Sequence, residues 1–432
     1  MTPKASIAQY EFRQDATAKL LLLTTRRVFS DDQIRAIRQL ATEVKDWDFF
    51  VETAAKKFSI TFAYNALKMH ASEIVPTEAV EALEKSSRRS TLAAMRVAAA
   101  FINFHKKCIE HSGIKYAYLK GIALSCQFDR PYLDRFSRDV DVLVDSDDIQ
   151  VLVDTALSKG YQLLSDSNSK EIATKRSDIE FIARHSPVVL LKSPEFVLIE
   201  VHRKMGKMSV SFDTKSAIDE AVEVSFSGIT IRALEPTLHF VYVCYHHSRH
   251  FWSHLHWLSD LHTMLVHEDV ERQRALTLAS SLGIKPSIEA AYDFNELIGA
   301  PDSWGKIDYT ATRGAQFLRV CLINLEGGRE LEYQLRESKT LGEFISAWQI
   351  SPGRYFSFWR NSWATRIRPS VAQHMKYQFP RYFHWMYWAE NILILMKNSI
   401  AHLPLQIARV FHARTSMRAS EEKRIEGDDA HE

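Results

Sequence analysis

The clearest alternation of apolar and polar residues lies in the segment 139–144. Valines at positions 140, 142 and 144 alternate there with Asp139 and Asp141. Because successive side chains of a strand point to opposite faces, the valines face a core and the two carboxylates share the other face. Two carboxylates about 7 Å apart on one strand face repel each other unless a cation lies near them. The pattern therefore predicts a strand that holds a hard divalent ion such as Mg²⁺.

The residues around this strand predict one compact α/β unit. In order, its elements are a strand at 115–119, a helix at 122–128, the acidic strand, a helix ending near 157, and strands at 178–183, 188–191 and 196–202. Within the last strand, Glu200 lies between Ile199 and Val201, so its side chain points away from the face that carries this apolar pair. The sequence thus supplies a third carboxylate from a second strand.

Apolar residues recur at helical spacing on both sides of this unit. Ser30 is a predicted N-cap for a helix over 33–44, and a long helix runs from Pro76 towards Gly113. A hairpin is predicted at 224–232, followed by helices at 237–247 and 252–267. The predicted fold class is α+β, a small mixed sheet flanked by helical regions. The predicted domains are an N-terminal helical region (1–113), the α/β core (114–232), a helical domain completing the cleft (233–340), and an aromatic and basic helical region with a frayed tail (341–432).

Composition narrows the class of protein. Lys and Arg together number 55 and Asp and Glu 53 among 432 residues, so the overall charge gives no strong nucleic-acid signal, although a local basic patch is compatible with it. The four cysteines are scattered without a CxxC pair, which disfavours a zinc knuckle and fits a reducing compartment. Neither an N-terminal apolar region nor an apolar stretch of membrane-spanning length is present. A cytoplasmic location is expected.

Short motifs carry a family resemblance. They are Leu119-Lys120-Gly121, Arg138-Asp139-Val140-Asp141, Gly160-Tyr161 and Ile199-Glu200-Val201-His202. This series resembles the polymerase-β-like nucleotidyltransferase superfamily and, within it, a bacterial family of uncharacterised nucleotidyltransferases. The resemblance covers about residues 45–270, since the flanks at Asp46-Trp47 and at 257–261 are also similar.

The resemblance implies transfer of a nucleoside monophosphate from an NTP to a hydroxyl-bearing acceptor. Mg²⁺ or Mn²⁺ would be held by Asp139, Asp141 and Glu200, one of which would also take the acceptor proton. Family context suggests a cell-surface polysaccharide precursor as the acceptor. Two other functions stay open. One is toxin-like transfer of the nucleoside monophosphate to protein or tRNA, and the near-neutral charge of the chain disfavours tRNA. The other is a catalytically silent binding or scaffold protein in envelope assembly.

Basic residues near the acids are candidates for binding the triphosphate. Gly121 ends a strand at the mouth of a helix, where backbone N–H groups favour a phosphate, and Lys120 adds a positive charge. Related enzymes usually have Gly-Ser or Gly-Gly here, whereas this chain has Lys120-Gly121-Ile122. The other candidates are Arg135, Arg138, His202 and Arg203; His202 would either orient Glu200 or contact phosphate.

Two further segments leave their role open. The histidines at positions 246, 247, 250, 254 and 256 and Asp260 show i,i+4 spacings, which suit a metal site, a helix contacting base, ribose or acceptor, or plain packing. Residues 354–414 combine Trp, Phe, Tyr and Arg. That composition suits stacking on bases or sugars, peripheral contact with the inner membrane, or helices buried against the core.

Overall fold

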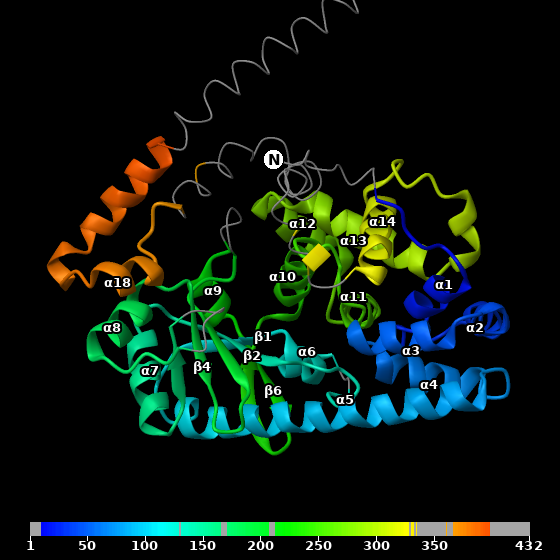
Figure 1. The fold of residues 1–432 in the computed structure, drawn as a ribbon, viewed down its shortest axis with the longest axis horizontal. Helices are drawn as coiled ribbons and strands as arrows, with labels where there is room; N and C mark the ends of the chain where they lie inside the picture. The colour runs from blue at the N-terminus through cyan, green and yellow to red at the C-terminus, as the bar shows by residue number, and fades with distance from the viewer. Residues whose placement is uncertain are drawn as a thin grey trace, which may run out of the picture. The chain divides into compact units, whose positions relative to one another are not determined.

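The computed structural model describes residues 10–128, 131–165, 171–206, 212–327, 330–331, 334, 360 and 366–397. The chain forms two compact units, Met1–Asn361 and Ser362–Glu432. The first unit therefore contains all three regions predicted before residue 341, and the division into four domains stays a prediction. Figure 1 shows the ribbon of both units.

A seven-stranded mixed sheet forms the centre of the first unit, with the strand order β3-β4-β5-β2-β1-β7-β6. The strands are β1 (Tyr116–Leu119), β2 (Asp139–Val144), β3 (Gln162–Leu164), β4 (Val188–Lys192), β5 (Leu198–His202), β6 (Val222–Phe226) and β7 (Ile229–Ala233). β2 is antiparallel to β1 and parallel to β5. The predicted α+β fold, with a mixed sheet and helical regions at both ends, is confirmed.

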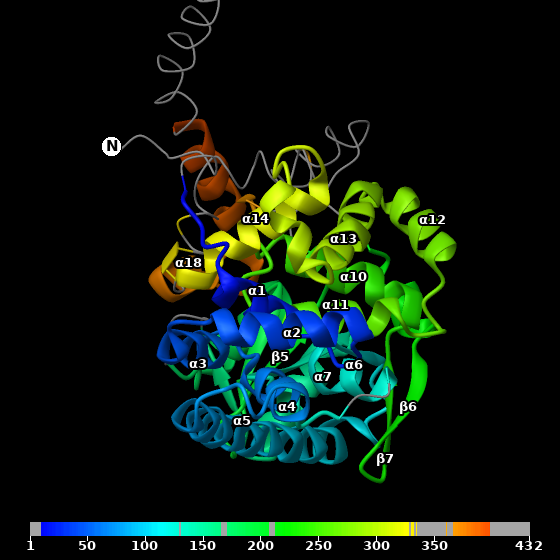
Figure 2. The ribbon, with the colours of Figure 1, turned by 90° about the vertical axis from the view of Figure 1, so that its right-hand side faces the viewer.

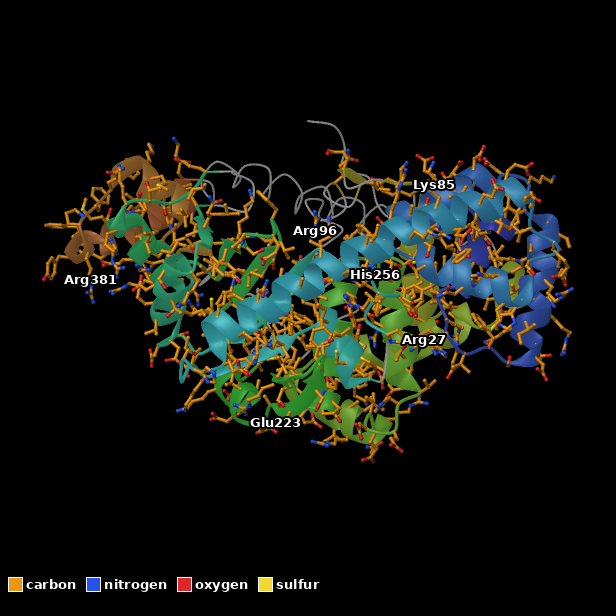
Figure 3. All side chains as sticks on the ribbon, turned by 90° about the horizontal axis from the view of Figure 1, so that it is seen from below. Arg27, Lys85, Arg96, Glu223, His256 and Arg381 are labelled. Atoms are coloured by element: carbon orange, nitrogen blue, oxygen red, sulfur yellow. The ribbon has the colours of Figure 1, made fainter. Side chains whose placement is uncertain are left out.

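The long helix α5 (Thr77–Phe104), continued by a π-helical turn at His105–Ile109, covers one face of the sheet. Phe101 of α5 contacts the ring of Tyr118 at 4.5 Å between centroids, and Tyr118 lies opposite Val142 in the β1–β2 register. The valine face of β2 therefore points to α5, and the acidic face points the other way. Figure 1 shows α5 below the sheet, and Figure 3, seen from below, shows it crossing this face with Lys85 and Arg96 along its length.

The acidic face of the sheet is joined to a large helical core, in which Leu119 and Leu143 are buried together with Phe240 and Val241 of α10. Further helices of this side are α6 (Gly121–Gln127), α9 (Thr214–Asp219), α10 (Pro236–Ser248), α11 (His256–Leu265), α12 (Arg272–Leu282), α13 (Lys285–Ile298) and α14 (Arg313–Glu326). The N-terminal helices α1 (Ala16–Leu23), α2 (Asp31–Glu43), α3 (Trp47–Lys56) and α4 (Ile60–His70) contribute to the same core. Figure 2 shows α1, α2 and α4 one below the other.

Several local predictions hold and others are wrong. Ser30 caps α2 through a capping box with Gln33, as its position predicts. The segment 178–183, predicted as a strand, belongs to the helix α8 (Arg176–His185), because Ile179, Ile182 and Ala183 recur at helical spacing and are buried. The short strand β3 was not predicted from the sequence. The helix predicted to end near residue 157 is α7 (Ile149–Ser158).

The helix predicted at 252–267 begins only at His256. Phe251 and Trp252 have φ values of 56° and 49° and are fully buried, so the chain turns sharply between α10 and α11. The i,i+4 spacing of His250 and His254 therefore does not place them on one helix face.

The second unit is built around Tyr387, which is fully buried. Its hydroxyl accepts a hydrogen bond from the Phe379 N–H (2.9 Å) and lies 3.1 Å from Nδ1 of His374, which is in α18 (Val371–Tyr377). A helical segment at 385–397 follows a short turn at Arg381–Phe383. Of the predicted segment 354–414, residues 354–359, 361–365 and 398–414 lie outside the described residues. Within the parts that the structure describes, no helix has the length and apolarity needed to cross a membrane.

Candidate active site

Parallel pairing of β2 with β5 brings two of the predicted acids side by side. Asp141 is in register with Glu200, so both carboxylates project from the same face of the sheet, and His202 follows two residues later on that face. The ligand atoms of Asp141, Glu200 and His202 lie within 4.8 Å of one another. A group of two carboxylates and one imidazole at this spacing has the donor set of a divalent metal site.

Asp141 is the electrostatic centre of this group. Its Oδ1 lies 2.8 Å from Nε2 of His202 and 3.0 Å from Nζ of Lys120. Burial alone would raise the pKa of Asp141, but the Lys120 ammonium and the His202 hydrogen bond lower it below its ordinary value. The same His202 Nε2 is 3.5 Å from Oε2 of Glu200, so one imidazole contacts both acids.

Asp139 lies at the outer end of β2 and is half-buried. Burial and the charges of Asp141 and Glu200 raise its pKa, outweighing the opposite effect of Lys120 and Arg138. It lines the same cavity as Asp141 and Glu200, although the group within 4.8 Å contains His202 and not Asp139. The three predicted acids are thus brought to one cavity.

The cavity has a volume of about 610 Å³ and five walls. They are the acidic strand ends with Lys120 and Gly121, the loop 135–138, the turn 56–58 between α3 and α4, histidines 246, 250, 254 and 256 with Trp257, and the end of α14 at 324–327. Both helical regions therefore contribute walls to it, and it is large enough to take much of a nucleotide.

The turn from β1 into α6 has a conformation that few residues adopt. Lys120 has φ 48° and ψ −157°, and its N–H donates to Nε2 of His239 at 3.0 Å. Burial lowers the pKa of His239 to about 3, so the ring is neutral, and its Nδ1–H donates to Oε1 of Gln127 at 2.6 Å. A buried hydrogen-bonded chain thus holds the Lys120 backbone in place.

Gly121→Ala is expected to destabilise the first unit by about 1–2 kcal/mol, because Gly121 has φ 50° and a Cβ would lie 3.3 Å from Oγ of Ser137. Urea unfolding of the two proteins measures the difference. Gly305→Ala is the matched control, since nothing lies within 4 Å of its Cβ position, and its effect should stay within about 0.5 kcal/mol. Equal effects of the two substitutions would contradict this account of the turn.

The two predicted arginines of the loop 135–138 differ. Arg135 is buried and forms two hydrogen bonds of 2.8 Å with Asp260 of α11, which ties the loop to the helical side. Arg138 is exposed at the cavity, with its guanidinium 5.1 Å from the centroid of the Phe58 ring. Arg138 is therefore the one of the pair whose guanidinium is accessible to an anionic ligand.

Arg203 differs from the prediction. Its guanidinium donates to the carbonyl oxygens of Ala183 and Ser186 at the end of α8, and it is not among the residues that line the cavity. This is a helix C-terminal contact, where a cation is favourable. The structure brings His202 to the acids and leaves Arg203 away from them.

The histidines are divided between cavity wall and core. His246 lies 3.4 Å from Nζ of Lys120 through its Nε2, and burial lowers its pKa well below the ordinary value, so a neutral ring faces the ammonium. His247 is buried, stacks on Trp257 at 4.4 Å, and lies 3.8 Å from Asp260. Among the described residues, no three of these histidines form a metal-binding group.

Sequence reasoning missed three parts of the site. His239 supports Lys120, Phe58 with φ 61° stacks on Phe136 in the cavity wall, and residues 324–327 close one side. Phe58 gives no signal in a sequence, because positive φ is unusual for a bulky residue. Residues 324–327 follow all three acids by more than 120 positions in the sequence.

Comparison with known proteins gives a family match. A family model described as "uncharacterised nucleotidyltransferase" matches residues 43–297. No curated protein and no solved structure matches the chain. The matched range includes every strand of the sheet and the segment 236–265, which contains α10, α11 and the histidines.

Proposed function

The chain belongs to this family of uncharacterised nucleotidyltransferases, and on that premise we propose that it transfers a nucleoside monophosphate from an NTP to a hydroxyl-bearing acceptor. The observation that carries the proposal is the register of β2 with β5, which sets Asp141 beside Glu200 on the floor of a cavity that Asp139 also lines. Converging carboxylates of this kind are the arrangement that nucleotidyl transfer requires.

The donor set suits a hard divalent ion. Asp139, Asp141 and Glu200 offer carboxylate oxygens, which Mg²⁺ and Mn²⁺ prefer, and we propose these three as its ligands. A bound ion would lower the pKa of the attacking hydroxyl and neutralise charge on the phosphate oxygens. His202 acts as a positioning residue, because its imidazole contacts Asp141 and Glu200 together.

Further residues would orient the substrates. Arg138 is exposed at the cavity and suits binding of the triphosphate as a planar donor. Gly121 brings the backbone at the start of α6 close to the acids, and Lys120 supplies positive charge beside Asp141. One of the carboxylates would accept the proton of the attacking hydroxyl. Arg135 contributes indirectly, by fixing the loop that carries Arg138.

For the acceptor, we propose a hydroxyl of a cell-surface polysaccharide precursor. Neutral histidines and aromatic rings in the cavity wall support an acceptor with many hydroxyl groups, because such rings stack on sugars and donate single hydrogen bonds. Transfer to protein or tRNA, and a silent scaffold, are the alternative results of the test that follows.

Incorporation of radiolabelled NTP in the presence of Mg²⁺ and a cell extract tests the proposed function. Each of the four NTPs is used in turn, with wild type and the Asp139→Ala/Asp141→Ala variant. Label should enter a glycan or lipid-linked fraction with the wild type alone. Label in protein or tRNA instead supports the toxin-like alternative. Equal behaviour of the two proteins with every NTP would remove the enzymatic proposal and leave the scaffold.

We also propose that the second unit contacts an anionic membrane surface. Between residues 382 and 396 it exposes large apolar side chains, namely Tyr382, Phe383, Trp385, Met386, Trp388, Ile392, Leu393, Ile394 and Met396. Exposed Arg381, labelled in Figure 3, directly precedes these residues. Aromatic side chains beside basic ones favour the headgroup region of an anionic bilayer.

Trp385→Ser/Trp388→Ser is expected to weaken binding to phosphatidylserine vesicles by about tenfold or more, because burying one large apolar side chain contributes about 1.5–3 kcal/mol. Vesicle co-sedimentation measures this. Met69→Ser changes a side chain that is 76% exposed in the first unit and should leave binding unchanged. A wild type that stays in solution beside these vesicles would contradict the proposal.

A further inference from the structure

We propose that the Lys120 ammonium takes the place of one of two metal ions in the transfer site. The protein would then use a single divalent ion together with this lysine. The inference rests on the proposed nucleotidyl transfer and deepens it. It differs from the usual arrangement, in which two metal ions about 3.5–4 Å apart provide both charges.

The position of the Lys120 side chain is the first observation. Its Nζ lies 3.0 Å from Oδ1 of Asp141 on β2 and 3.4 Å from Nε2 of His246 on α10, so two separate elements hold the ammonium. The side chain is only 12% exposed. Lysines are almost never buried to this extent unless they are paired, and a lysine that merely attracts phosphate would extend towards the solvent side of the cavity.

The second observation concerns the oxygens of Asp141. A carboxylate shared by two ions must offer each of them an oxygen lone pair. Oδ1 of Asp141 already contacts both Lys120 and His202, at 3.0 and 2.8 Å. The remaining oxygen, Oδ2, is left for one ion, which Glu200 can share because it is in register beside Asp141.

The backbone at Lys120 provides a third, independent observation. Its φ of 48° with ψ of −157° is a strained conformation for a residue that has a side chain. The buried chain from Gln127 through His239 to the Lys120 N–H holds it there. Strain of this kind persists only where the surroundings enforce it, and here it directs the lysine side chain towards the acids.

The charges of the site are consistent with this reading. Asp139, Asp141 and Glu200 carry three negative charges when ionised, and one ammonium with one divalent ion balances them.

Equilibrium dialysis and electron paramagnetic resonance with Mn²⁺ test the proposal. Wild type, saturated with the α,β-methylene analogue of each NTP in turn, should bind one Mn²⁺ per chain and show no spectral broadening from a closely spaced Mn²⁺ pair. Lys120→Met keeps the length of the side chain and removes its charge, and should bind two. Lys56→Met removes an exposed lysine of the same cavity, which pairs with Glu52, and should still bind one.

The outcomes separate this inference from the proposed function. Two coupled Mn²⁺ ions in the wild type would overturn the role of Lys120 while leaving nucleotidyl transfer intact. A wild type and a Lys120→Met variant that both bind one ion would also overturn it, provided thermal melting shows that the variant is folded. If the variant does not fold, the number of Mn²⁺ ions bound by the wild type tests the inference alone: one ion supports it and two overturn it. A wild type that binds no Mn²⁺ at all would count against the proposed function itself.

Discussion

Asp141→Asn is expected to lower the rate of nucleotidyl transfer by about 10³-fold or more, equivalent to about 4 kcal/mol of lost transition-state stabilisation. Asparagine keeps the shape of the side chain but removes the charge that Lys120 and His202 both contact. The bound ion would lose a ligand at the same time. Initial rates at saturating Mg²⁺ and NTP measure the effect, and thermal melting verifies that the variant is folded.

Asp147→Asn is the matched control for this substitution. Asp147 follows the same strand, is exposed, and is not among the residues that line the cavity. Its variant should keep the wild-type rate within about twofold, since surface substitutions away from a site have small effects. A wild-type rate in Asp141→Asn would show that the carboxylate pair is not the site of the reaction.

The second prediction concerns the stability of the first unit. Arg135→Ala is expected to lower the free energy of unfolding by about 3–5 kcal/mol, because it leaves the fully buried Asp260 without the guanidinium that gives it two hydrogen bonds. Urea unfolding with a fluorescence readout measures the loss.

Two further variants show whether the lost stability comes from the unpaired charge of Asp260 or from lost packing of the arginine. Arg138→Ala changes an exposed arginine of the same loop and should cost about 1 kcal/mol or less. Arg135→Met/Asp260→Leu removes both charges together and should recover most of the stability, because a buried ion pair contributes little beyond the cost of its own desolvation. A double variant as unstable as Arg135→Ala would mean that packing of the arginine, and not the stranded charge, causes the loss.

Local patterns in the sequence predicted the part of the site that depends on strand alternation. The two-residue period of β2 assigned Asp139 and Asp141 to one face, and the same period put Glu200 opposite Ile199 and Val201. Pairing β2 with β5 then brought Asp141 and Glu200 together, as expected for strands of one sheet.

The remaining features depend on contacts or backbone angles that no local pattern contains. Arg135 pairs with an aspartate 125 positions away, so its burial could not be predicted from the loop. Arg203 follows His202 directly, but it lies beyond the last residue of β5 and turns towards α8. In α8 itself, alternating Ile179, Glu180 and Phe181 look like a strand, while the packing of Ile179, Ile182 and Ala183 favours a helix.

The most direct test of the account is the fate of each phosphate when the protein, Mg²⁺ and its acceptor fraction are supplied with NTP labelled at one position. Label on the α-phosphate should appear in the acceptor, and label on the γ-phosphate should leave entirely as pyrophosphate. The Asp139→Ala/Asp141→Ala variant should transfer neither. Transfer of the γ-label to the acceptor, or release of labelled inorganic phosphate without transfer of the α-label, would contradict nucleotidyl transfer at this site.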